Sequence, residues 1–135
     1  MASPVSEPPV LAHPPRLRRI LRSFGYAFEG LATLLRTQPN FVVHVVLASL
    51  AVLVGLILRL GLTDMAVVVL TIALVLVVES FNTALETLCD LVSPEVHPLI
   101  KRAKDVSAAA VLLAALAAVA LAALLFLPRL ASMIK

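Results

Sequence analysis

Glycine is scarce in this chain and is missing from its C-terminal half. The four glycines are Gly25, Gly30, Gly55 and Gly61, so no glycine-rich loop that cradles a phosphate can follow residue 61. This absence excludes the Walker, Rossmann and soluble protein-kinase loops together. The chain also has one cysteine and no tryptophan. A single cysteine excludes both a disulfide framework and a metal site built on paired thiols.

Charged residues are also scarce. They make up 14% of the 135 residues, whereas 61% are hydrophobic, and the mean hydropathy is +1.07. A soluble domain has about 25% charged and about 45–50% apolar residues. A water-soluble fold of this composition would expose hydrocarbon over most of its surface. We therefore predict a small integral membrane protein, whose length allows one domain at most.

The first residues differ from the rest. Residues 1–15 hold five of the nine prolines and have no apolar periodicity, which predicts a disordered leader. This segment lacks the apolar region and the basic start of a secretory signal. We expect one domain over residues 16–135.

Residues 16–37 have the pattern of an amphipathic helix. Their large apolar side chains recur at helical spacing, and most of their arginines fall on the opposite side. The apolar stripe comprises Leu17, Ile20, Leu21, Phe24, Phe28, Leu31 and Leu35. A basic amphipathic helix of this kind lies in the membrane interface. The alternative, a helix packed on a soluble core, is less favoured because the remaining chain offers no such core.

Three apolar segments follow, at about residues 39–60, 64–91 and 99–127. Each is long enough to cross a bilayer as a helix, so the predicted fold is all-α, with a surface helix and three transmembrane helices. We expect a tight turn at residues 61–64 and expect Pro128 to end the last helix. The alanines of the third segment predict that it packs inside a bundle.

The basic residues predict the orientation in the membrane. Eight of the eleven Lys and Arg lie before the first span or in the loop after the second. These regions are therefore expected in the cytoplasm, with the C-terminus outside. The net charge of +3 follows from this asymmetry and suits anionic lipid. We expect no nucleic-acid partner, since the chain has one Tyr and no Trp.

A line of acids in the second span is the strongest functional signal. Glu79, Glu86 and Asp90 lie within about 20° of one line on a helix, with Asn82 beside them. A charged acid at the centre of a membrane helix costs about 2.5–3.5 kcal/mol. Three acids on one stripe must therefore face protein, water or a cation. A structural polar seam between helices is the alternative, but it explains three carboxylates poorly.

Lys104 and Asp105 complement these acids at the start of the third span. Lys104 can neutralise a phosphate or a carboxylate, and Asp105 can accept hydrogen bonds or help to hold a metal. Ordinary positive charge at a helix end is the alternative. Together these groups favour phosphoryl transfer with Mg²⁺, which needs alignment, charge neutralisation and a base.

Two motif blocks carry a family resemblance. One runs from Glu79 to Asp90 (ESFNTALETLCD), and the other from His97 to Asp105 (HPLIKRAKD). Both closely resemble the small prokaryotic diacylglycerol kinase and undecaprenol kinase family, and the resemblance extends over about residues 16–127. It implies a homotrimer with active sites shared between chains, in a bacterial cytoplasmic membrane. It also implies transfer of the γ-phosphoryl group of ATP, with Mg²⁺, to a membrane lipid alcohol.

The resemblance also assigns roles to residues. Glu79 matches the general base, Asn82 the neighbouring catalytic amide, and Glu86 a carboxylate that holds metal and contacts the nucleotide. The other positions that match nucleotide-contacting residues are Arg19, Tyr26, Glu95, His97, Lys104 and Asp105. Gln38 stands where the family often has a second metal-binding glutamate. Its carbonyl oxygen can still contact Mg²⁺, but one negative charge is lost.

Two questions stay open at this level. Diacylglycerol and undecaprenol both end in a primary hydroxyl, so the substrate depends on groove shape rather than on a polar motif. The intramembrane acid also admits a proton- or cation-conducting oligomer that uses Glu79. A non-catalytic membrane scaffold is a third hypothesis.

Overall fold

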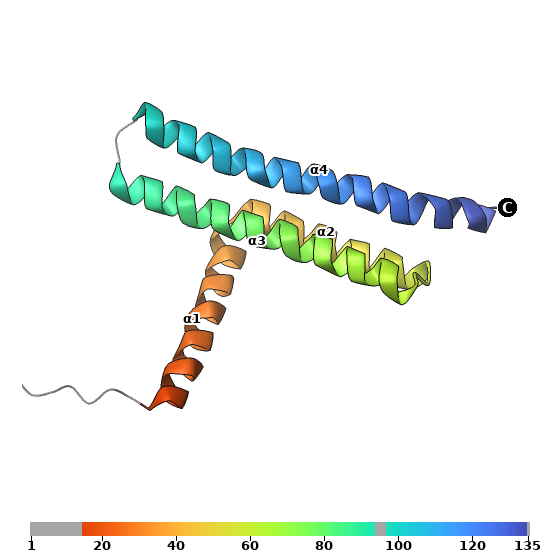
Figure 1. Ribbon diagram of the computed structural model, residues 1–135, viewed down its shortest axis with the longest axis horizontal. Coiled ribbons are helices and arrows are strands. Elements are labelled where there is room, and N and C mark those ends of the chain that lie inside the picture. Colours follow the sequence, from red (N-terminus) through yellow and green to blue (C-terminus); the bar gives the residue numbers. More distant parts are fainter. Residues whose placement is uncertain (1–14, 94–96, 135) are drawn as a thin grey trace, which may run out of the picture. The chain divides into compact units, whose positions relative to one another are not determined.

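The computed structural model describes residues 15–93 and 97–134, and all of its regular structure is α-helical. The helices are α1 (Arg16–Thr37), α2 (Pro39–Ile57), α3 (Leu62–Val92) and α4 (Pro98–Ile134) (Figure 1). The all-α prediction is confirmed. The expected leader lies outside the described residues except for Pro15.

The chain divides into two compact units, one up to Ala32 and one from Thr33 onward. Most of α1 belongs to the first unit. No residue of α1 is buried, and its apolar side chains are among the exposed large hydrophobics, with Phe24 at 60% and Phe28 at 69%. An amphipathic helix with an open apolar face is what the interfacial interpretation predicts.

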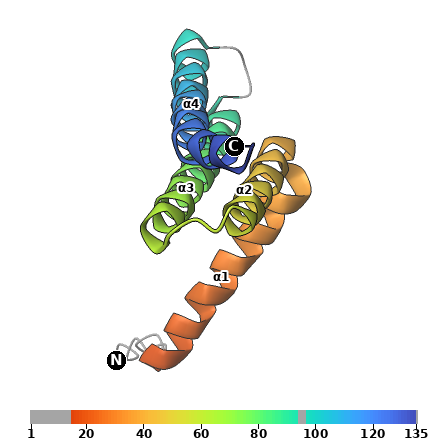
Figure 2. The same ribbon diagram turned by 90° about the vertical axis from the view of Figure 1, so that its right-hand side faces the viewer.

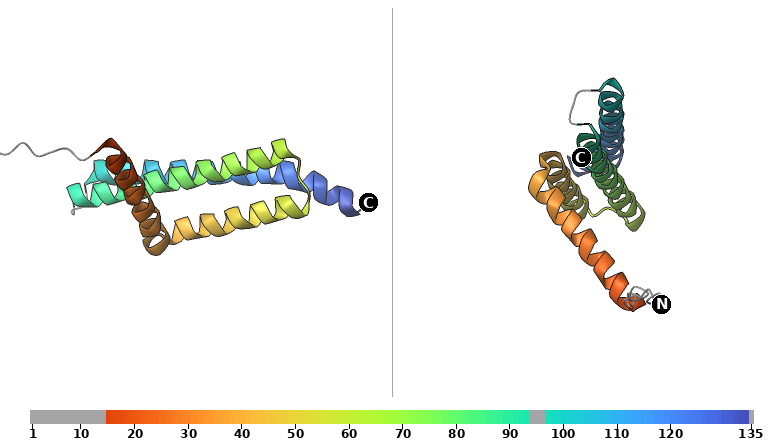
Figure 3. Two further views of the ribbon diagram at one scale, coloured as in Figure 1. Left: turned by 90° about the horizontal axis from the view of Figure 1, so that it is seen from below. Right: turned by 90° about the vertical axis from the view of Figure 1, so that its left-hand side faces the viewer.

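The second unit contains three helices that are long and apolar enough to cross a membrane. They have 19, 31 and 37 residues, which correspond to about 28, 46 and 55 Å. The hydrocarbon core of a bilayer is about 30 Å thick. Both α3 and α4 therefore extend beyond it, and the C-terminal end of α4 projects past the turn between α2 and α3 (Figure 3).

The turn between α2 and α3 is a Schellman motif. The Leu60 N–H donates to the Gly55 carbonyl at 3.0 Å, and the Arg59 N–H donates to the Leu56 carbonyl at 3.1 Å. Arg59 occupies the left-handed position at φ 51°, where glycine is usual. This turn precedes the expected one at residues 61–64, because α3 already begins at Leu62 and includes Asp64 in its first turn.

Within the second unit, α3 is the central helix. It packs against both α2 and α4, and Figure 2 shows the three helices grouped together. At the turn, α2 and α3 approach closely, since a Cβ added at Gly55 would lie 2.8 Å from the Met65 Cε. In contrast, α4 has no buried residue among those described. The expectation that the Ala-rich helix is packed inside a bundle is therefore not met within a single chain.

Pro128 does not end the last helix, contrary to the prediction. The helix continues through it to Ile134. Proline removes one backbone donor and crowds the preceding turn, so in soluble proteins it commonly kinks or breaks a helix. Membrane helices tolerate it because local adjustments, side chains or water satisfy the freed carbonyl. The proline rule therefore placed the end of α4 about two turns too early.

Candidate active site

One face of α3 carries the buried residues. Spacings of 7, 4, 3 and 7 residues separate them, which keeps them on a single stripe of a helix. They are Val68, Val75, Glu79, Asn82 and Cys89. The stripe is apolar in the N-terminal half of α3 and polar in the C-terminal half. Glu79 therefore continues the core-facing side of α3, whereas Glu86 is half-buried and Asp90 is exposed.

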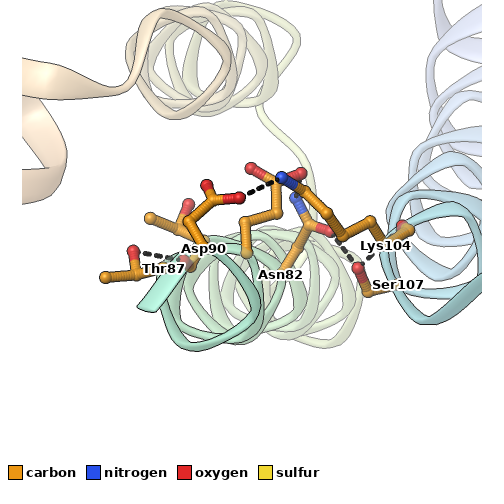
Figure 4. A network of polar contacts seen from close by, with 7 residues as sticks. Asn82, Thr87, Asp90, Lys104 and Ser107 are labelled. Carbon is orange, nitrogen blue, oxygen red and sulfur yellow. Dashed lines mark hydrogen bonds and ion pairs between the residues drawn. The ribbon is translucent and has the colours of Figure 1, made fainter. Parts of the chain in front are cut away.

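Asn82 is the centre of a hydrogen-bonded network. It is 8% exposed, and its Nδ2 donates to Glu86 Oε1 at 3.1 Å. Its Oδ1 accepts from the Ser107 hydroxyl of α4 at 2.6 Å. Figure 4 shows Asn82 between α3 and α4, facing Ser107. The network joins the motif block of α3 to the beginning of α4.

Lys104 also connects the two helices. Its Nζ lies 2.8 Å from Asp90 Oδ1, with the lysine side chain 35% exposed and the aspartate 69%. Figure 4 shows the lysine extending from α4 to Asp90 of α3. Asp105, one residue later, instead pairs with Lys101 of its own helix at 2.6 Å, and both side chains are exposed. The two neighbouring residues thus have partners on different helices.

Glu79 differs from these residues, because no described side chain pairs with it. It is 2% exposed, and it makes no hydrogen bond or ion pair with the described residues. Its ionisable neighbours are His44 of α2 and Glu86 of its own helix. No fully enclosed side-chain oxygen or nitrogen in the described chain lacks a partner. The Glu79 carboxyl therefore keeps a small opening to its surroundings.

An apolar cavity adjoins Glu79 on the side of the N-terminal half of α3. Its volume is about 270 Å³, and all three long helices line it. Representative lining residues are His44 and Ala51 of α2, Val75 of α3, and Ala118 of α4. Val75 lies one helical turn from Glu79. Apolar space at membrane depth therefore lies one turn from the buried acid.

The remaining predicted site residues lie elsewhere or outside the description. Gln38 is the N-cap of α2, and its Nε2 lies 3.5 Å from the Thr37 hydroxyl. His97 precedes α4, where its Nδ1 accepts from the Leu99 N–H at 3.2 Å. Arg19 and Tyr26 lie exposed on α1, within the unit that ends at Ala32. Glu95 lies outside the described residues.

The sequence analysis missed Ser107. Its half-buried hydroxyl contacts the network, although no motif pointed to it. One signal was available: Ser107 lies one turn after Lys104 and on the same face, as a polar residue that precedes a long run of apolar residues. Spacing alone does not identify its partner, which is on another helix.

Glu86 has the properties expected of a magnesium ligand. One of its oxygens accepts from Asn82, which leaves its other oxygen and further lone pairs available. The described residues contain no group of three His, Cys, Asp or Glu side chains that could hold a metal. Mg²⁺ does not require one, since it commonly takes one or two carboxylates together with substrate phosphates. The donor set therefore fits a metal that arrives with a nucleotide.

Comparison with known families tests the interpretation. The sequence profile described as prokaryotic diacylglycerol kinase matches residues 25–126. The chain belongs to this family. The matched region contains α2, α3 and most of α4, and therefore the whole network around Asn82. Membership of this family, together with the three membrane-length helices, makes the chain a bacterial membrane protein of a kinase family.

Individual family members are similar over most of this chain. A diacylglycerol kinase of Synechocystis sp. is 43% identical over 84% of the chain, which spans 66% of that relative, just under two thirds of its length. An undecaprenol kinase of Bacillus subtilis is 34% identical over 87% of the chain and 96% of its own length. A diacylglycerol kinase of Escherichia coli is 34% identical over 75% of the chain and 83% of its own length. The similar proteins therefore include some named for diacylglycerol and one named for undecaprenol.

Proposed function

We propose that this protein is an ATP- and magnesium-dependent lipid kinase of the bacterial cytoplasmic membrane. It transfers the γ-phosphoryl group of ATP to the hydroxyl of a membrane lipid alcohol, either diacylglycerol or undecaprenol. The observation that carries the proposal is the polar stripe on α3, where buried, unpaired Glu79 precedes the Asn82–Glu86 pair and Lys104 approaches from α4.

Glu79 acts as the general base in this proposal. The lipid hydroxyl oxygen forms a bond to the γ-phosphorus, the bond from that phosphorus to the β–γ bridging oxygen breaks, and ADP leaves. The hydroxyl proton passes to the Glu79 carboxylate. A base must lie within hydrogen-bond reach of the proton that it accepts. The absence of a competing partner for Glu79 among the described residues supports this role.

Lys104, Glu86 and Asn82 act on the nucleotide side. Lys104 exchanges Asp90 for a phosphate oxygen, because both are anionic acceptors for the same ammonium group. Asn82 holds Glu86 through the 3.1 Å hydrogen bond, so that a free carboxylate oxygen is available to metal. Bound Mg²⁺ neutralises phosphate charge that develops during transfer. Asp105, Arg19, Tyr26, Glu95, His97 and Gln38 are proposed as further nucleotide or metal contacts through the family resemblance.

The lipid is proposed to reach Glu79 from within the membrane. The apolar cavity lined by Val75 and Ala118 supports a substrate whose hydroxyl meets the acid while its chain stays in hydrocarbon. The orientation proposed has the N-terminus and the loop after α3 in the cytoplasm, where ATP is present. We also propose a homotrimer in which neighbouring chains share active sites.

A kinase assay tests the function directly. Purified protein in bilayers that contain either diacylglycerol or undecaprenol should transfer label from γ-labelled ATP to the lipid, and chelation of Mg²⁺ should abolish the transfer. The lipid that is labelled faster in the same bilayer identifies the substrate. Absence of labelled product from both lipids would reject the proposal.

Nothing in the family membership favours the alternative of an ion-conducting oligomer. Calorimetric titration with magnesium–ATP separates the two functions, since a kinase binds the nucleotide and a conductor does not. Ion flux in the absence of nucleotide, with no nucleotide binding, would support the conductor.

A further inference from the structure

We infer that Ser107 is a positioning residue, which fixes the orientation of the Asn82 amide and, through it, the Glu86 carboxylate. The inference rests on the proposed kinase function and adds to it a residue outside the matched motif blocks. The Ser107 hydroxyl makes no hydrogen bond to Glu79 or to Glu86. It acts through one hydrogen bond to Asn82, a residue 25 positions earlier on a different helix.

The geometry determines which bond the Ser107 hydroxyl makes. This group has one hydrogen and two acceptors within reach, which are Asn82 Oδ1 at 2.6 Å and the Lys104 carbonyl at 2.9 Å. The shorter contact is to Asn82. Donation to the amide oxygen defines which end of the amide faces α4, because a carboxamide has an acceptor on one side and donors on the other.

A rotated amide would disrupt the network. If Asn82 turned by 180°, its oxygen would face Glu86 Oε1, and two acceptors would meet without a hydrogen between them. In the observed orientation, Nδ2 donates to Glu86 at 3.1 Å. Ser107 and Glu86 therefore favour the same orientation from opposite sides.

Burial makes the Ser107 bond difficult to replace. Asn82 is 8% exposed and Ser107 is half-buried, so water has little access to the amide oxygen. Without the hydroxyl, the oxygen loses its donor, and a buried acceptor without a partner is unfavourable. The amide is then held from the Glu86 side alone, so the donor that holds one Glu86 oxygen is less firmly oriented.

Three variants test the inference. Ser107→Ala removes the hydroxyl, and Ser107→Thr keeps it. Ser132→Ala is the matched control, because Ser132 also lies on α4 and donates to the carbonyl three residues earlier, at 2.7 Å, but it does not contact Asn82. We expect Ser107→Ala to lower kcat by about tenfold, which corresponds to about 1.4 kcal/mol of transition-state stabilisation. Ser107→Thr should restore most of the rate, and Ser132→Ala should equal the parent protein.

A second measurement does not depend on turnover. In nucleotide-free protein, one of the two side-chain N–H signals of Asn82 in the NMR spectrum should be shifted away from its position in a free carboxamide, since that hydrogen is bonded to a carboxylate. Ser107→Ala should move the shifted signal toward the position of a free carboxamide, and Ser107→Thr should leave it in place. A merely structural serine would lower thermal stability without changing these signals.

The outcomes separate this inference from the proposed function. If the parent protein phosphorylates lipid and Ser107→Ala keeps both its rate and its Asn82 signals, the positioning role is wrong and the kinase function stands. A lowered rate in Ser107→Ala with unchanged Asn82 signals would also contradict the role. If the parent protein phosphorylates no lipid, the proposed function fails first.

Discussion

The Glu79 side chain combines almost complete burial with the absence of a hydrogen-bond partner among the described residues. Burial of a carboxylate without a partner is unfavourable, because the charge loses its hydration. Ionisable residues inside membrane-spanning helices commonly have a functional role. Asn82, one turn away, is also buried but has a partner for each end of its amide. The contrast supports the proposed role of Glu79 as the group that accepts the proton of the substrate.

Glu79→Gln should therefore lower activity without loss of stability. A glutamine cannot accept the hydroxyl proton, and general bases contribute about 10²- to 10⁴-fold to rates. We expect kcat to fall at least about 100-fold, with thermal stability in detergent unchanged or raised, because a neutral amide is easier to bury. Asp64→Asn is the control, since it removes an acid from the other end of α3. Activity of Glu79→Gln within a few-fold of the parent would contradict the base assignment.

Lys104 and Asp90 should respond oppositely to substitution. Lys104→Met should raise the KM for magnesium–ATP by more than about tenfold, because a charged contact to phosphate is lost. Asp90→Asn releases Lys104 from a competing acceptor. The aspartate is mostly exposed, so its pairing is weak, and the KM should fall by no more than about fivefold.

Steady-state kinetics measure the KM for magnesium–ATP of both variants. Arg102→Met is the control for the loss of a positive charge near the start of α4. Loss of activity in Asp90→Asn as severe as that in Lys104→Met would instead assign Asp90 to the site itself.

At the level of the helices, the turn between α2 and α3 carries backbone strain. Arg59 adopts φ 51°, a conformation that places a side-chain Cβ too close to the carbonyl oxygen. The two hydrogen bonds of the Schellman motif and the close approach of Gly55 to Met65 hold it there. The energetic cost of this strained backbone is confined to the turn. The turn precedes the N-terminal end of α3, whereas Asn82 lies in the C-terminal half of that helix.

Arg59→Gly should therefore stabilise the protein. Glycine adopts positive φ readily, and the gain is partly offset by its greater freedom in the unfolded chain. We expect an increase of up to about 1 kcal/mol in the free energy of unfolding, measured by denaturant titration in detergent. Arg59→Ala is the matched control, since it removes the same charge but keeps the strain. Equal stability of the Gly and Ala variants would mean that the left-handed residue carries no cost.

At the scale of the whole molecule, the chain leaves much apolar surface open. None of the described residues of α4 is buried, whereas α3 packs against both α2 and α4. Lipid covers such surface in a membrane, and so do other chains, because small residues allow close helix contacts there. The Ala-rich faces of α4 are therefore the places where the proposed trimer would pack.

Mixed oligomers test the shared active site. Glu79→Gln and Arg19→Ala should each be inactive alone if both residues take part in catalysis. When the two variants are co-reconstituted, a shared site can combine an intact Glu79 from one chain with an intact Arg19 from its neighbour. We expect activity clearly above that of either variant alone. If each site is made of one chain, every site carries a defect and the mixture stays inactive.

The sequence alone determined that the chain is helical, that it has three membrane-length segments, and that Glu79, Asn82 and Glu86 share one helix face. These features depend on hydropathy and on the 3.6-residue period, which are local properties. The end of α4 was missed because the effect of Pro128 depends on what surrounds it. The motif blocks were specific enough to identify the family, which the match over residues 25–126 confirmed.

The partners of the polar side chains depend on how the helices pack in the folded chain. Ser107 and Asn82 are 25 residues apart on different helices, so no periodicity within one helix relates them. Lys104 and Asp105 are adjacent in the chain, yet one reaches α3 and the other stays with Lys101, because consecutive residues on a helix point about 100° apart. Pairing between helices depends on how they pack against each other, and this packing is a property of the folded chain.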